Sequence, residues 1–128
     1  MSELFDESLE QEFITESREH LDTIEPELLA LEQEQSAASP ETINKVFRAI
    51  HSIKGGAGFL AYDSLKTLSH QMENVLVKVR DGDLALTHDV IDVLLRSIDR
   101  LRMMLDDLAH SAAIDCDREV RDLQAFLK

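Results

Sequence analysis

Residues 49–60 read AIHSIKGGAGFL, and this stretch combines a helical pattern with three glycines that follow a histidine and a lysine. Its apolar residues recur three and four positions apart, as they do on one face of an α-helix: Ile50, Ile53, Ala57 and Leu60. Each glycine inside a helix costs about 1 kcal/mol relative to alanine. The three glycines therefore need a reason other than helix formation, or the helix must end among them.

The same helical period continues outward on both sides of this stretch. It predicts five helices, at about 5–34, 40–59, 63–81, 87–110 and 115–127, and no segment alternates with the period of a strand. Between the first two helices, residues 35–39 (QSAAS) form a short linker. Short connections between long amphipathic helices make neighbours antiparallel. The predicted fold class is all-α: an up-down four-helix bundle with an additional short C-terminal helix.

Capping residues set the predicted helix boundaries. Ser39 followed by Pro40 is typical of a helix start, with the serine as N-cap and the proline in the first turn. Asp63 or Ser64 is expected to cap the third helix, and Gly82 suits the position just past its end. Thr87 is the predicted N-cap of the fourth helix.

One proline lies inside the first predicted helix. Pro26 lacks the N–H group that would bond the carbonyl of Asp22, and its ring crowds that carbonyl. We therefore expect a kink or a break between these two residues.

Length, charge and composition narrow the classes of function. The chain has 128 residues, of which 44% are hydrophobic, enough for one domain (1–128) with a proper core. A net charge of −13 disfavours binding to nucleic acid or anionic membranes. The first residues lack the features of a signal peptide, and no apolar run could cross a bilayer, so we expect a cytoplasmic protein. The single cysteine, Cys116, cannot form an internal disulfide.

Polar residues with chemical potential lie along the margins of two helices. On a helical wheel, His51 lies at the edge of the buried face of the second helix, in a strip that also contains Asn44, Gly55 and Gly58. Lys54 lies between that strip and the apolar face. The third helix has a similar strip of Lys66, His70, Glu73 and Val77. If these helices pack antiparallel, a carboxylate and a second imidazole could face His51.

This combination suits nucleophilic chemistry at an imidazole. A neutral imidazole is nucleophilic at one nitrogen while the other carries a proton, and a carboxylate that accepts that proton's hydrogen bond fixes the ring. Glu73 is the predicted orienting group for His51. A phosphoryl group on the free nitrogen would add about two negative charges, and Lys54 is the local counter-charge.

Two segments and a turn carry a family resemblance: HSIKGGAGFL at 51–60, SHQMENVL at 69–76 and RDGDLALT at 80–87. Together with the acidic first helix, they resemble the histidine phosphotransfer (HPt) domain at the N-terminus of CheA-type chemotaxis histidine kinases. The resemblance spans essentially the whole chain. It implies that His51 is the phosphorylated histidine, that Lys54 and His70 support it, and that Glu73 bonds its ring.

The resemblance also implies a set of partners. A kinase ATP-binding domain would donate the phosphoryl group, and an aspartate of a CheY-like response-regulator receiver domain would accept it. The chain itself would be monomeric, would bind no cofactor, and would rely on partner domains for Mg²⁺ and ATP. We expect it to be the N-terminal fragment of a longer chain.

Docking of a receiver gives the glycines a function. A side chain beside His51 would hold the two domains apart, so Gly55 and Gly58, with Asn44 on the same strip, are expected to form the docking surface. Gly56 is expected to point away and to meet at most a local backbone need.

Other interpretations explain parts of the sequence. A histidine at a core edge is often structural, and the glycines could end a helix or allow close helix packing. A non-catalytic interaction bundle that docks a basic partner explains the charge but not the strip around His51. A metalloenzyme would need paired Glu-x-x-His motifs, and only a reversed His70-x-x-Glu73 occurs. A kinase active site is disfavoured because no glycine-rich phosphate loop follows a strand.

Overall fold

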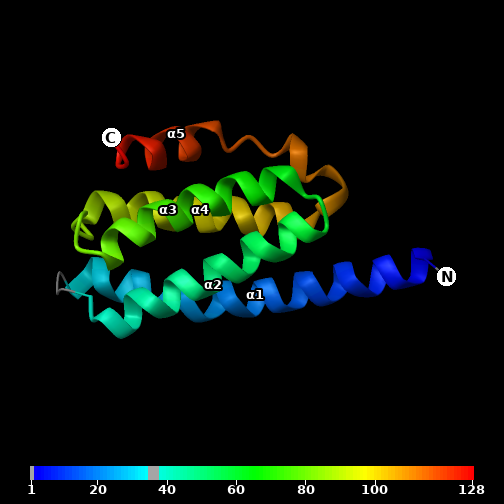
Figure 1. The fold of residues 1–128 in the computed structure, drawn as a ribbon, viewed down its shortest axis with the longest axis horizontal. Coiled ribbons are helices and arrows are strands. Elements are labelled where there is room, and N and C mark those ends of the chain that lie inside the picture. The colour runs from blue at the N-terminus through cyan, green and yellow to red at the C-terminus, as the bar shows by residue number, and fades with distance from the viewer. Residues whose placement is uncertain (1, 35–37) are drawn as a thin grey trace.

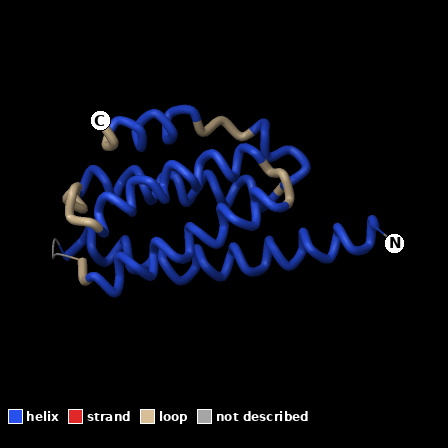
Figure 2. The backbone as a smooth tube through the Cα atoms, in the orientation of Figure 1, coloured by secondary structure: helices blue, strands red, loops and turns tan. Residues whose placement is uncertain are grey.

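The computed structural model describes residues 2–34 and 38–128, and every regular element in these ranges is a helix (Figures 1 and 2). The elements, in chain order, are α1 (Ser2–Glu34), α2 (Pro40–Phe59), α3 (Asp63–Arg80), α4 (His88–Asp106), the 3₁₀ helix η1 (Leu108–Ala113) and α5 (Asp117–Ala125). The predicted all-α class is confirmed. Most of the predicted linker lies at residues 35–37, outside the described residues.

Four long helices form the bundle, and a fifth packs on its outside. α1 contacts α2 and α4, while α3 contacts α2, α4 and α5, so α1 and α3 lie on opposite corners. The N-terminal part of α1 extends past the ends of the other helices (Figure 1). Within the described ranges, no helix combines the length and the apolar character needed to cross a bilayer.

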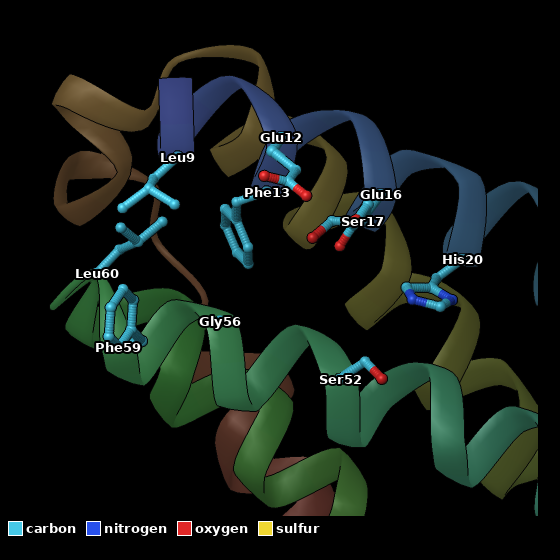
Figure 3. A pocket seen from close by; sticks show the side chains of 10 residues that line it. All are labelled: Leu9, Glu12, Phe13, Glu16, Ser17, His20, Ser52, Gly56, Phe59 and Leu60. Carbon is cyan, nitrogen blue, oxygen red and sulfur yellow. The ribbon is translucent and has the colours of Figure 1, made fainter. Parts of the chain in front are cut away.

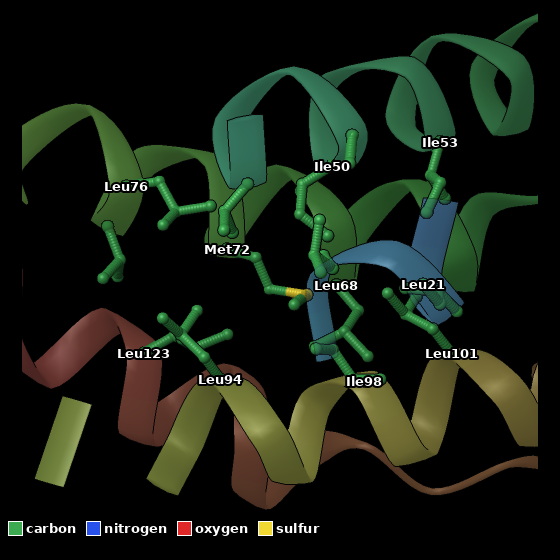
Figure 4. Packing of buried hydrophobic residues seen from close by; sticks show 14 of the residues in the cluster. Leu21, Ile50, Ile53, Leu68, Met72, Leu76, Leu94, Ile98, Leu101 and Leu123 are labelled. Atoms are coloured by element: carbon green, nitrogen blue, oxygen red, sulfur yellow. The ribbon is translucent and has the colours of Figure 1, made fainter. Parts of the chain in front are cut away.

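Apolar side chains from all five α-helices meet in one core (Figure 4). The largest fully buried side chains come from the helical stripes that the sequence predicts: Leu21, Ile24, Leu28, Ile50, Ile53, Leu65, Leu68, Met72, Leu76, Leu94, Ile98 and Leu101. Burying a side chain of this size contributes about 1.5–3 kcal/mol. This core fixes the packing of α2 against α3, and so positions their polar margins.

The sequence predicts a kink or a break before Pro26. α1 continues through this residue, so a break is wrong, whereas a kink stays a prediction. Pro26 is exposed, which leaves room for water at the carbonyl that lost its partner. Just before the proline, Asp22 and Glu25 hold the helix to α4, because each bonds Arg102 at 2.9 Å. Leu28, just beyond the proline, is fully buried. Tertiary contacts thus outweigh the local cost of the proline.

The α2 start agrees with the prediction, and its end has a tight reversal. The Ser39 hydroxyl accepts a hydrogen bond from the Thr42 N–H at 3.1 Å. At the other end, the Tyr62 N–H donates to the Ala57 carbonyl at 2.8 Å and the Ala61 N–H to the Gly58 carbonyl at 3.2 Å, which is the Schellman pattern. Ala61 therefore has a positive φ of 65°, a conformation that favours glycine.

This reversal corrects the predicted cap of α3. The helix begins directly after it, with Tyr62 as the N-cap residue and no capping side chain, so the prediction of Asp63 or Ser64 is wrong. Gly82, at the other end, has φ of 82° and follows the last turn as predicted.

The fourth predicted helix is shorter than expected. Thr87 caps α4 as predicted, with its hydroxyl accepting from the Val90 N–H at 3.3 Å. The α-helix ends at Asp106 instead of residue 110, because Asp107 takes non-helical angles (φ −150°, ψ 77°) and a 3₁₀ segment follows. The short α5 is anchored by the buried Glu119, which accepts from Arg100 at 2.7 Å.

Candidate functional site

The antiparallel packing of α2 on α3 brings His51 and Glu73 together. The Glu73 carboxylate bonds Nδ1 of the imidazole through Oε2. The His51 side chain is 59% exposed, whereas that of Glu73 is only 11% exposed. The carboxylate is thus a fixed group at the edge of the core, and the ring that it orients faces solvent. This is the pairing that the two helical strips predict.

The charge of Glu73 determines which nitrogen of His51 carries the proton. Burial raises the pKa of this carboxyl, but hydrogen bonds from Lys54 and His51 outweigh burial and hold the pKa below its usual value. The carboxylate is therefore ionised at neutral pH and can only accept hydrogen bonds. Nδ1 must then be the donor, and in the neutral ring this leaves the lone pair on Nε2.

Lys54 contacts the same carboxylate from the next turn of α2. Its Nζ donates to Oε1 of Glu73 at 2.7 Å, and its side chain is 24% exposed. Each carboxylate oxygen therefore has its own donor. In this arrangement Lys54 keeps Glu73 charged, a contribution that the sequence analysis did not include. Its expected role as counter-charge to a phosphoryl group stays a prediction.

The two remaining polar candidates lie at the surface. His70 is exposed on α3, one turn before Glu73, and Asn44 is exposed on α2, two turns before His51. Within the described part of the chain, neither forms a hydrogen bond with His51, Lys54 or Glu73. Their supporting and docking roles stay predictions.

The glycines of α2 differ in their surroundings. A Cβ built on Gly55 meets nothing within 4 Å, and one built on Gly58 meets only the Lys66 side chain, at 3.6 Å. Both residues are exposed, and neither places a side chain beside His51. Their docking role stays a prediction.

Gly56 faces α1, so the expectation of a merely local backbone role is wrong. A Cβ there would lie 2.6 and 2.7 Å from ring carbons of Phe13. Figure 3 shows the Phe13 ring directed at this glycine in the cleft between the two helices. Gly56 therefore permits close helix packing, which is one of the alternatives that the sequence left open.

An aromatic residue outside the predicted site, Phe47, also contacts His51. The rings of Phe47 and His51 are stacked, with centroids 5.8 Å apart and planes 15° from parallel. The guanidinium of Arg80, from the end of α3, lies 4.7 Å from the centroid of the same phenyl ring. The four-residue spacing from Phe47 to His51 is a signal for their contact. The contact of Arg80 with Phe47 depends on the register of α3 against α2, so the spacing of residues along one helix does not reveal it.

Basic residues gather next to this stack despite the negative charge of the protein. A groove between the N-terminal half of α2 and the end of α3 is lined by Glu41, Asn44, Lys45, Phe47, Arg48 and Arg80. Within residues 2–34 and 38–128, no three His, Cys, Asp or Glu side chains are grouped as a metal site requires.

Comparison with known families and proteins agrees with the sequence resemblance. Residues 8–111 match the profile of the Hpt domain family. The chain is 35% identical over 115 residues to the chemotaxis protein CheA of Bacillus subtilis, covering 90% of this chain. It is 39% identical over 105 residues to the CheA of Salmonella typhimurium, covering 82% of this chain. It spans only 16% and 15% of the lengths of those two relatives.

Two solved structures with the same fold come from CheA proteins. The phosphorylated P1 domain of CheA3 in complex with CheY6 from R. sphaeroides superimposes with a TM-score of 0.77 at 25% identity, covering 94% of both chains. The CheA phosphotransferase domain from Thermotoga maritima gives a TM-score of 0.72 at 34% identity, covering 81% of this chain and 96% of that domain.

Proposed function

Because the chain belongs to the Hpt domain family, we propose that it carries a phosphoryl group on His51 within a chemotaxis signalling pathway. The donor is ATP bound to a histidine-kinase domain, and the acceptor is an aspartate of a response-regulator receiver. The observation that carries the proposal is an exposed imidazole whose Nδ1 is bonded to a buried, ionised carboxylate. That arrangement leaves Nε2 as the nucleophile.

The first transfer forms one bond and breaks one. The Nε2 lone pair of His51 bonds to the γ-phosphorus of ATP, the bond to the bridging oxygen breaks, and ADP leaves with that electron pair. The ring, now substituted at Nε2 and protonated at Nδ1, carries a positive charge. The Glu73 carboxylate at Nδ1 offsets this charge as it develops, which lowers the barrier.

The second transfer reverses the change at the ring. An oxygen of the receiver's aspartate bonds to phosphorus, the P–N bond breaks, and its electron pair returns to Nε2 as neutral imidazole is restored. The receiver brings the Mg²⁺ that balances charge on the phosphoryl oxygens. Lys54, at 2.7 Å from Glu73, is near enough to the ring to serve as a further counter-charge once the phosphoryl group is present.

Access to the phosphoryl group depends on the surface beside His51. We assign Gly55, Gly58 and Asn44 to the receiver-docking surface, because all three residues are exposed and neither glycine places a side chain there. A related P1 domain has been solved in complex with CheY6, which supports a receiver as the partner class. His70, exposed one turn from Glu73, is assigned a supporting role at the rim.

Labelling with phosphate tests this function. The chain is incubated with radiolabelled ATP and the ATP-binding domain of a CheA kinase, and a receiver is then added. We expect an acid-labile, base-stable phosphate on the chain that passes to the receiver. His51→Gln should keep its helicity and melting temperature but take up no label. A wild-type chain that stays unlabelled would instead support a non-catalytic interaction module.

A further inference from the structure

We propose that Phe47 is a positioning residue for His51 and that Arg80 acts by holding the Phe47 ring in place; this inference rests on the proposed function. Phe47 lies one helical turn before His51 on α2, and the two rings are stacked with their planes 15° apart. Arg80 reaches the same phenyl ring from α3, at 4.7 Å from its centroid. Phe47 is thus contacted by both His51 and Arg80 at the edge of the site.

Glu73 alone does not fix the imidazole fully. A single hydrogen bond at Nδ1 constrains the direction of one ring edge, but the ring can still tilt about the line of that bond. A phenyl ring packed against the imidazole face opposes this tilt, and a centroid separation of 5.8 Å lies in the range that aromatic pairs prefer. Phe47 and Glu73 therefore constrain different motions. Together they fix the direction of the Nε2 lone pair.

Arg80 is suited to hold Phe47 for two reasons. Its guanidinium is planar and always charged, so it stacks on an aromatic face and is attracted by the ring's electrons. Its side chain is 39% exposed and also bonds Asp81, at 3.4 Å, at the end of α3. The phenyl ring is half-buried. The Phe47 ring is thus packed against the core on one side and contacts the Arg80 guanidinium of α3.

Substitution of Phe47 tests the positioning role. Phe47→Leu keeps an apolar side chain at the same place but removes the aromatic face, and Phe47→Tyr restores that face. The first readout is the NMR spectrum of the His51 imidazole in the unphosphorylated chain, where C–H protons above a phenyl face are shifted upfield. We expect Phe47→Leu to move these signals downfield and Phe47→Tyr to restore them.

The second readout is phosphorylation by the CheA ATP-binding domain with saturating ATP. Loss of an aromatic pair of this kind lowers the ratio of stacked to unstacked orientations by a factor of about two to ten, so kcat should fall by up to that factor in Phe47→Leu. KM for the chain should be unchanged, and Phe47→Tyr should recover kcat. Unchanged imidazole signals, or a change in KM alone, would overturn the inference.

A double-mutant cycle decides how Arg80 acts. If it works through the Phe47 ring, Arg80→Ala should lower kcat in the wild-type chain but have no further effect in Phe47→Leu. An equal loss in both backgrounds would show direct contact with the donor and would overturn this part of the inference. Arg48→Ala is the matched control for the imidazole signals, because Arg48 lines the same groove and its removal should not move them.

The result separates this inference from the proposed function. Normal labelling of wild type together with unaltered behaviour of Phe47→Leu overturns the positioning role alone. Failure of the wild-type chain to accept phosphate overturns the proposed function and the positioning role with it.

Discussion

The three glycines of α2 allow a prediction in which neighbouring positions respond with opposite signs. Replacing glycine by alanine inside a helix stabilises it by about 1 kcal/mol where space allows. Gly55 has such space, since a Cβ there meets nothing within 4 Å. Gly55→Ala should therefore raise the free energy of unfolding by about 0.4–1 kcal/mol.

At Gly56 the same substitution meets the Phe13 ring. Its Cβ would lie 2.6 Å from a ring carbon, against an ordinary carbon contact of about 3.5–4.0 Å, so the ring or α1 must retreat by about 1 Å. Phe13 is only 8% exposed and stacks on Tyr62, which leaves it little freedom. Overpacking of this kind costs about 1–3 kcal/mol, which exceeds the helical gain.

Urea denaturation of both variants measures the difference. Gly56→Ala should be less stable than Gly55→Ala by about 1–3 kcal/mol, or several degrees in melting temperature. A Gly56→Ala variant as stable as Gly55→Ala would refute the argument that close packing of α1 requires this glycine.

Three further predictions concern docking, charge and backbone strain. Gly58→Leu should leave the bundle folded, because Gly58 is exposed and a Cβ there meets only the Lys66 side chain at an ordinary contact distance, yet it should sharply slow transfer to the receiver. Wild-type transfer kinetics, or an unfolded variant, would contradict this. Glu73→Ala should slow phosphorylation markedly without abolishing it. Because the folded-state pKa of Glu73 is lowered from 4.5, the contribution of its carboxylate to stability is present above about pH 4.5 and is lost as the pH falls further. The difference in unfolding free energy between wild type and Glu73→Ala should therefore narrow below that pH. A difference that does not change with pH would argue against the ion pair. Ala61→Gly should raise the free energy of unfolding by up to about 1 kcal/mol, seen as a higher urea midpoint, because glycine adopts the positive φ of 65° without strain. A lower midpoint would show that no strain is stored at Ala61.

The helices were largely predictable because local signals mark them. Ser39, Thr87 and Gly82 cap or end helices through their own side chains or backbone, so their positions could be read from short stretches of sequence. Pro26 shows the limit of such signals, because Ile24 before it and Leu28 after it are both buried in the core and keep α1 helical across it. Ala61 carries no glycine-like signal, since its conformation is imposed by the α2–α3 reversal.

The centre of the site was predictable for a related reason. His51 and Lys54 lie one turn apart on α2, and antiparallel packing is enough to bring a carboxylate of α3 to them. The contact between Arg80 and Phe47 depends on the register of α2 against α3 at their far ends. The packing of Gly56 on Phe13 depends on where α1 lies, and the sequence around Gly56 carries no signal for that.

The central claim is that Nε2 of His51 carries the phosphoryl group, and locating that group in the phosphorylated chain tests it most directly. Correlation of the phosphorus signal with the imidazole protons, in chain labelled by the CheA ATP-binding domain and ATP, identifies both the residue and the nitrogen. Because Nδ1 is bonded to Glu73, we expect a phosphorus on Nε2 of His51 and none in His51→Gln. A phosphoryl group on Nδ1 of His51, or on His70, would contradict the account.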